Sequence, residues 1–365
     1  MSSMSPRAEK PPITFWSIRI ATISGIPIRL HTTFLLFILW EIWANRAGDV
    51  TISLLFAFAI SVCILLHELA HALVARHYGY ATSEITLSPI GGYTLTDGRP
   101  TPKQELLISG AGPLVNAILA GFFFFVMIFT RQVSGDFRLS SENFWQMLCF
   151  ANVIMAVFNM MPVFPLDGGR MLRALLAMFI PIHTATKITT GTGQVLSVVL
   201  GIVGLVIGAP ILCVIAFFLF LGASRELANS TLLSLLHGKT VGDAMSRQYL
   251  WLAHGQTAQS AADMMSQTPQ DDYPVVVGHD VVGIVSSAAI QSAVNTGDKD
   301  AYLATLMTRN YLQLTPDVDL TVAAEEMGVA QAPALVYEGD NLVGTLSNLS
   351  LQRFIDFQAG AAKKR

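Results

Sequence analysis

One short segment places two histidines and a glutamate inside an otherwise apolar helical pattern. The stretch LLHELAHALVARH covers residues 65–77, and His67-Glu68-Leu69-Ala70-His71 fits the pattern H-E-x-x-H. Histidines four residues apart share one face of a helix, so both rings can bind one Zn²⁺ while Glu68 stands beside the metal. The pattern therefore predicts a zinc site on this helix.

A catalytic zinc usually has three protein ligands, so a third must come from elsewhere in the chain. Asp167 is the best candidate. It follows Pro162 and Pro165, which break an apolar helix, and it precedes Gly168 and Gly169, which permit close approach of backbones. A broken helix at membrane depth should line a cavity. The alternative is that Asp167 only caps a helix.

The composition is that of a membrane protein. Hydrophobic residues make up 52% of the 365 residues and charged residues only 13%, against about 25% charged residues in soluble domains. The net charge of -3 and the lack of a basic stripe give no reason to expect nucleic acid as a partner. Six apolar runs are long enough to suggest membrane spans, near 30–45, 51–76, 106–130, 144–161, 188–207 and 209–224.

The second run carries the histidines well inside the bilayer. At about 1.5 Å per residue, His67 lies roughly 24 Å from the start of that run and about 15 Å from its end. Ionisable groups at such depth are costly and mark function by default. Packing alone is therefore a weak alternative for this segment.

Two stretches resist a helical interpretation, 15–30 and 83–97. Alternating β-branched residues with a Gly-Ile-Pro or Gly91-Gly92 turn predict strands. The predicted fold class is a mainly α polytopic membrane protein with six transmembrane helices and a small β-sheet at the cytoplasmic face.

Basic residues set the expected orientation. An even number of spans puts both termini on one side, and the positive-inside bias assigns that side to the cytoplasm. The residues on that side are Arg7, Lys10, Arg19, Arg29, Arg99, Lys103, Arg170, Arg173 and Lys187, against Arg46, Arg131 and Arg138 on the other.

The chain repeats itself after Ser224, where charges return. The segment 241–290 aligns with 303–351, and each copy predicts a strand, helix, strand, strand and helix. Matching positions are Met245 with Met307, Ala261-Ala262 with Ala323-Ala324, and Gly283 with Gly344. The pattern resembles an α/β pair of cystathionine-β-synthase-type (CBS) repeats. Expected domain limits are a segment with a short strand at 1–28, a six-helix domain at 29–228, the repeats at 237–357 (241–295 and 303–355) and a polar tail at 358–365.

Three ordered motifs resemble the site-2 protease family of intramembrane zinc metalloproteases, in its prokaryotic branch with a C-terminal CBS pair. They are HELAH (67–71), SGAGPLVN (109–116) and NMMPVFPLDGGR (159–170). The resemblance implies that His67, His71 and Asp167 bind one zinc ion and that Glu68 acts as general base and then acid.

The same resemblance implies a substrate and a location. The stretch around Asn159, Pro162 and Pro165 would admit and hold a single-pass or membrane-associated protein, cut in or near its transmembrane segment. Such substrates are regulatory proteins, and the enzyme would lie in the cytoplasmic membrane of a prokaryote.

A substrate helix hides its carbonyl groups, so we expect it to unwind and pair with the strand at 83–97, which contains Gly91 and Gly92. Asn116 and Asn152 either orient the peptide or stabilise its oxyanion, or they only form hydrogen bonds between helices.

The CBS pair raises the question of an adenine nucleotide. The ribose-binding turn of such repeats ends in aspartate, but here the matching positions hold Ala289 and Ser350. Nucleotide binding is therefore doubtful, and a role in gating or homodimer formation gains weight.

Two other functions remain open at this point. One is a CBS-regulated metal-ion transporter, which would not need Glu68 as a base. The other is an inactive relative that binds membrane helices, and intact Glu68 speaks against it.

Overall fold

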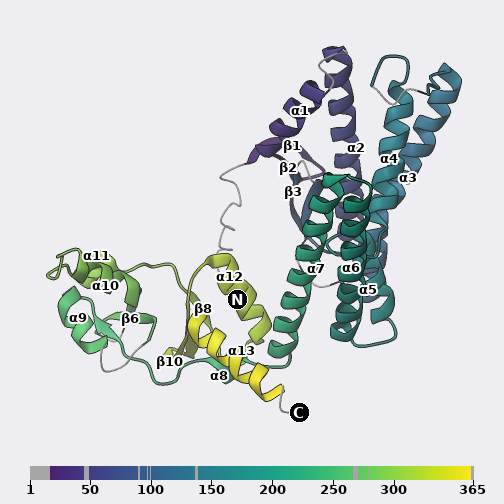
Figure 1. Ribbon diagram of the computed structural model, residues 1–365. Coiled ribbons are helices and arrows are strands. Elements are labelled where there is room, and N and C mark those ends of the chain that lie inside the picture. The colour runs from purple at the N-terminus through teal and green to yellow at the C-terminus, as the bar shows by residue number, and fades with distance from the viewer. Residues whose placement is uncertain are drawn as a thin grey trace. The chain divides into compact units, whose positions relative to one another are not determined.

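The computed structural model describes residues 17–362 except 45–48, 89–90, 97, 99, 136–138, 266–269 and 279. The chain divides into two compact units, with the boundary between Ser230 and Thr231 (Figure 1). The first unit is mainly helical and the second contains the sequence repeats.

Helices build the first unit, and all but α5 are mainly apolar. They are α1 (Thr33–Ala44), α2 (Val50–His77), α3 (Pro102–Thr130), α4 (Phe144–Asn159), α5 (Asp167–Ala177), α6 (Ile182–Val206) and α7 (Pro210–Leu236). Four of them, α2, α3, α6 and α7, are long and apolar enough to cross a membrane. Large apolar side chains cover their outer faces, and Phe129 is 91% exposed. Such a surface fits a lipid environment.

Each of the six predicted spans coincides with a helix, but two of these helices are short. Helix α1 has 12 residues and α4 has 16, which correspond to about 18 and 24 Å, against about 30 Å for a hydrocarbon core. The count of six spans therefore stays a prediction. Helix α7 also runs to Leu236, well past the predicted end at 224, because the change at Ser224 is one of polarity and not of helix propensity.

The predicted small sheet is confirmed. Its strands are β1 (Ser17–Ile23), β2 (Ile26–His31), β3 (Thr82–Ser88) and β4 (Gly91–Thr96), in the order β1-β2-β3-β4. Strands β2 and β3 are parallel, and the two outer pairs are antiparallel. Ile28 and Ile85 pack with Ala72 of α2 in one buried cluster. The sheet is thus fixed to the helix that carries the histidines, with β4 at one edge.

The second unit contains the predicted duplication. The first repeat consists of α8 (Val241–Ala244), β5 (Leu252–Ala253), α9 (Ala258–Met265), β6 (Asp272–Val277), β7 (Asp280–Ser286) and α10 (Ser287–Asn295). The second consists of α11 (Leu303–Leu306), β8 (Leu312–Leu314), α12 (Leu320–Ala330), β9 (Ala334–Glu338), β10 (Asn341–Leu346) and α13 (Asn348–Ala362). Both have the predicted order, with a one-turn helix added at the start.

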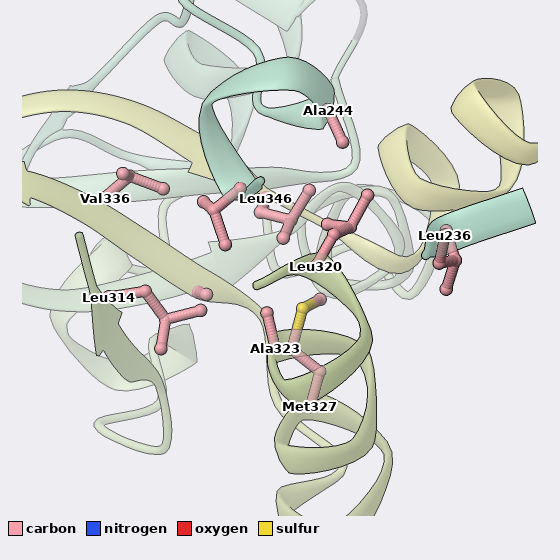
Figure 2. Close-up of a cluster of buried hydrophobic side chains, with 10 residues drawn as sticks. Leu236, Ala244, Leu314, Leu320, Ala323, Met327, Val336 and Leu346 are labelled. Carbon is pink, nitrogen blue, oxygen red and sulfur yellow. The ribbon is translucent and has the colours of Figure 1, made fainter. Parts of the chain in front are cut away.

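Each repeat has its own apolar core. Figure 2 shows the core of the second repeat, where Leu320 and Met327 of α12 face Leu314 and Val336 of the sheet. Leu236, at the end of α7, is also fully buried in this core. The corresponding cluster of the first repeat includes Tyr273, which is fully buried.

The two repeats exchange backbone hydrogen bonds. Ser246, at the start of the first repeat, pairs with Thr345 of β10, and Thr308 of the second repeat pairs with Ile284 of β7. In the second bridge, Ile284 N donates to Thr308 O at 2.8 Å and Thr308 N donates to Ile284 O at 2.7 Å. Each repeat therefore contributes one bridged residue to the edge of the other repeat's sheet.

Candidate metal centre

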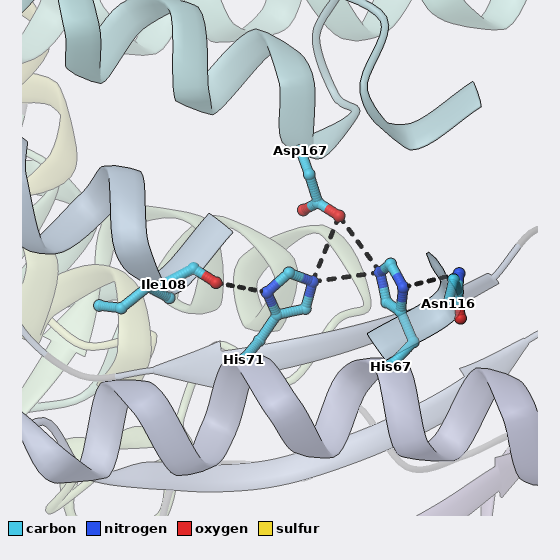
Figure 3. Close-up of polar contacts among 5 residues, drawn as sticks. All are labelled: His67, His71, Ile108, Asn116 and Asp167. Carbon is cyan, nitrogen blue, oxygen red and sulfur yellow. Dashed lines mark hydrogen bonds and ion pairs between the residues drawn. The ribbon is translucent and has the colours of Figure 1, made fainter. Parts of the chain in front are cut away.

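Two imidazole rings project from one face of α2. His67 and His71 are one helical turn apart, and both are buried. Their Nε2 atoms lie 3.1 Å from each other. Figure 3 shows both rings rising from the helix toward the same carboxylate. The close approach follows from the i, i+4 spacing, which brings side chains onto the same face.

That carboxylate belongs to Asp167, the first residue of α5. Its Oδ2 lies 3.2 Å from Nε2 of His67 and 3.2 Å from Nε2 of His71. The structure therefore brings together the three residues that the sequence selects, from positions 100 residues apart. Asp167 stands in the first turn of a helix, but its side chain is directed to the rings, as Figure 3 shows.

The turn before α5 has to be tight to place Asp167 there. A Cβ atom at Gly168 would collide with the carbonyl oxygens of Met160 and Met161, and one at Gly169 would lie 2.7 Å from Phe164 N. Both positions require glycine because the helix starts directly against the preceding backbone. The close approach expected of the Gly-Gly pair is present.

The other ring nitrogens are held by α3. Nδ1 of His71 lies 2.7 Å from the carbonyl oxygen of Ile108 and donates to it. Nδ1 of His67 lies 3.0 Å from the side-chain amide nitrogen of Asn116, whose Oδ1 has no hydrogen-bond partner among the described residues. Turning this amide by 180° places Oδ1 where it accepts Nδ1–H. Helix α3 thus leaves Nε2 of both rings directed to Asp167.

Glycine is also required where α3 passes the rings. A Cβ atom at Gly112 would collide with Nε2 of both His67 and His71. The space beside the two donor nitrogens is therefore kept open by the lack of a side chain. The sequence interpretation did not select Gly112, although its spacing of four from Asn116 was a signal that both lie on one face of α3.

The three donor atoms fit zinc in type and in spacing. Imidazole nitrogen and carboxylate oxygen bind Zn²⁺ at about 2.0–2.2 Å, so two ligands of a tetrahedral site are about 3.3–3.6 Å apart. The observed separations are 3.1, 3.2 and 3.2 Å. Glu68, also buried, is the next residue to His67 on the same helix. The arrangement offers three donor atoms to one zinc ion, with a carboxylate adjacent.

The two buried asparagines form contacts between helices. Asn116 of α3 contacts His67 of α2, and Asn152 of α4 donates to Cys63 Sγ of α2 at 3.4 Å. Both side chains are fully buried. Each side chain thus forms a hydrogen bond between helices, and that of Asn116 is to a ring nitrogen of His67. A contact of either asparagine with the peptide stays a prediction.

The other residues selected for the substrate lie near the turn or in the sheet. Asn159 is the last residue of α4 and is half-buried, as is Pro162. Pro165 is exposed, but its ring packs against Gly222 of α7. Gly91 and Gly92 begin β4 and pair with Ser88 and Leu87 of β3.

A cleft of about 610 Å³ lies between the two CBS repeats. Acidic, basic and hydroxyl groups share its wall, among them Arg247, Asp271, Asp272, Ser350 and Arg353. Burial raises the pKa of the Asp272 carboxyl to about 6, with a further contribution from the charge of Asp271. Ala289, by contrast, does not line this cleft.

Comparison with known proteins gives two family matches. Residues 55–134 and 131–200 match peptidase family M50, and residues 241–295 match the CBS domain. A zinc metalloprotease of Methanocaldococcus jannaschii is 28% identical over 342 residues, which are 93% of this chain and 96% of the relative. A second protein of that organism, a candidate zinc metalloprotease, is 30% identical over 134 residues, 32% of this chain and 67% of its own length. The solved site-2 protease of M. jannaschii shares 33% identity, covering 58% of this chain and 95% of that one, with a TM-score of 0.46.

Proposed function

The chain belongs to peptidase family M50, a family of zinc metalloproteases, and on that premise we propose that it cuts transmembrane or membrane-proximal segments of regulatory membrane proteins. The observation that carries the proposal is the triangle of His67 Nε2, His71 Nε2 and Asp167 Oδ2, with Glu68 buried on the same helix. These three residues would hold one zinc ion.

The residues divide the chemistry between them. Zinc, when bound, supplies a Lewis acid that lowers the pKa of water toward neutrality. Glu68 takes a proton from the attacking water and later donates a proton to the departing amine nitrogen, as the peptide C–N bond breaks. General acid–base catalysis of this kind contributes on the order of 10² to 10⁴ in rate. Asn116 and the Ile108 carbonyl hold the rings in the tautomer that presents Nε2.

The decisive experiment compares wild type with Glu68→Gln on a labelled single-span substrate, with zinc content and product measured on the same preparation. Loss of product with zinc retained supports the proposal, because only the proton carrier has been removed. Unchanged product would refute the role of Glu68. A transport function predicts zinc flux through both proteins and cleavage by neither.

The edge of the small sheet is the place we propose for an unwound substrate. Strand β4 has one neighbour, β3, among the described strands, so its other side can pair with an extended peptide. Gly91 and Gly92 would leave room for that peptide, and Asn159, Pro162 and Pro165 would border its entry from the membrane.

Proline at two adjacent positions of β4 tests this path. Tyr93→Pro and Thr94→Pro remove neighbouring N–H groups, one of which points to β3 and the other to the free edge of β4. The variant that loses the N–H group at the free edge should block cleavage without loosening the sheet. Ile20→Pro in β1, at the opposite edge, is the matched control. Wild-type cleavage in both β4 variants would contradict the proposed pairing.

The remaining assignments concern the second unit and its side of the membrane. We propose a protease domain at 29–228 and a CBS pair at 237–357 that regulates it or forms a homodimer, with both termini in the cytoplasm. Adenine nucleotide binding stays doubtful because of Ala289 and Ser350. A cysteine placed at Gly297 should react with an impermeant thiol reagent in inverted vesicles and not in right-side-out ones, and the reverse result would overturn the orientation.

A further inference from the structure

Arg173, a half-buried residue of helix α5, ties this helix and its Asp167 to two neighbouring helices. Arg173 lies six residues after Asp167, which is about 9 Å along the helix. Its guanidinium forms ion pairs with Glu105 of α3 and with Glu226 of α7. The side chains of Arg173 and Glu105 are 19% and 9% exposed, and that of Glu226 is 33% exposed.

The same guanidinium also contacts the turn before α5. Arg173 Cζ lies 5.2 Å from the ring centroid of Phe164, a fully buried residue three positions before Asp167. One side chain therefore touches α3, α7 and the turn that leads to the candidate ligand. Arginine suits this role because its planar fork can bind two carboxylates and stack on a ring at the same time.

The contact with α3 has a particular place on that helix. Glu105, Ile108, Gly112 and Asn116 fall within about 80° of one another around the axis, at 3.6 residues per turn. Ile108 and Asn116 contact the ring nitrogens, Gly112 lets the rings approach, and Glu105 binds Arg173. One face of α3 thus contacts both histidines and the helix that carries the aspartate.

We propose that Arg173 is a positioning residue for the third zinc ligand, and that it acts through Glu105 and Glu226 to hold Asp167 in register with the histidines on the common template of α3. The inference rests on the proposed assignment of Asp167 as a ligand. Metal sites tolerate errors of only about 0.2 Å in ligand distance, so a short helix that slips on α3 loses the site.

The experiment measures zinc affinity by competition with a chelator, on full-length protein in detergent and on the monodisperse, helical fraction only. Arg173→Gln should weaken zinc binding at least about tenfold, the usual effect of losing support behind a ligand. The matched control is Arg170→Gln, on the same helix and closer to Asp167. Arg170 is exposed and has no ion pair in the part of the chain that the structure describes. Its removal should leave the affinity unchanged.

Two further variants keep the inference testable if Arg173→Gln does not fold. Arg173→Lys keeps the charge but not the fork, and it should give an intermediate affinity. Glu105→Gln should weaken binding, and in combination with Arg173→Gln it should add no further loss, because both act through one contact.

The outcomes separate this inference from the function on which it rests. A wild-type protein that binds no zinc, or an Asp167→Asn variant with undiminished affinity, refutes the ligand assignment. A wild-type protein that needs Asp167, together with Arg173→Lys and Glu105→Gln variants of full affinity, overturns only the role of Arg173. A lower yield of folded protein with normal affinity would show that Arg173 is merely structural, and would overturn it equally.

Discussion

Replacing Gly112 with alanine should remove the zinc site while leaving the helix intact. The added Cβ would lie 2.5 Å from Nε2 and 2.6 Å from Cε1 of His67, and it would also collide with Nε2 of His71. Ordinary contact begins at 3.4 Å, so the His67 ring would have to retreat by about 0.9 Å, the difference between 3.4 and 2.5 Å, and the His71 ring by more. This exceeds the roughly 0.2 Å that metal ligation tolerates.

The Gly112→Ala change should maintain or raise the stability of helix α3, whereas it should lower the zinc affinity. Alanine is the better helix former by about 1 kcal/mol, so α3 should be at least as helical as before. Zinc affinity should fall by about 100-fold or more, beyond the usual cost of losing an outer contact. The assay is chelator competition with zinc content per chain, alongside the helical signal in circular dichroism.

Gly121→Ala is the matched control, because it makes the same change on the same helix at a site with no atom within 4 Å of the new Cβ. It should bind zinc as wild type does. Wild-type affinity in Gly112→Ala would show that the two Nε2 atoms are not the donors, and the reasoning from the triangle would fail with it.

Three further predictions concern separate parts of the chain. Asn116→Ala should weaken zinc binding by about 10- to 100-fold, whereas Asn116→Asp keeps an acceptor for Nδ1–H and should bind nearly as wild type. The pKa of Asp272, at about 6, lies above the ordinary 3.8, so the folded state is favoured at low pH and loses this stabilisation as pH rises from about 4 to above 6. Hydrogen exchange of β6, corrected for intrinsic rates, should show that loss in wild type and not in Asp272→Asn. Gly344→Ala places a Cβ 3.0 Å from Ser246 O and should cost about 1–3 kcal/mol in chemical unfolding, unlike Gly328→Ala, which meets open space.

Patterns carried by side chains could be predicted from the sequence. H-E-x-x-H puts two rings on one face by helical geometry alone. The prolines before Asp167 indicated that the helix breaks there, which allows Asp167 to approach the two rings. The repeat of 241–290 in 303–351 likewise predicted the order of strands and helices in both copies, since apolar periodicity and turn glycines are local features.

Contacts made through the backbone or between distant helices left no such pattern. The backbone carbonyl of Ile108 accepts a hydrogen bond from His71. Every residue has such a carbonyl group, so the sequence does not show which one is used. Arg173 was counted only as a basic residue for orientation, because nothing local shows that Glu105 and Glu226 meet it. Helix α7 was predicted too short because polarity was taken as a sign of its end.

The two β-bridges between the CBS repeats couple the folding and unfolding of one repeat to those of the other. Ser246 forms a β-bridge with β10 of the second repeat, and Thr308 forms one with β7 of the first. These edge positions of each repeat are therefore paired only while the other repeat is present. The pair should therefore melt in one cooperative step. A chain cut between Asn295 and Leu303 would leave each half with an orphaned strand edge, and such halves would be rescued only by mixing them or by exchanging edges with a second molecule.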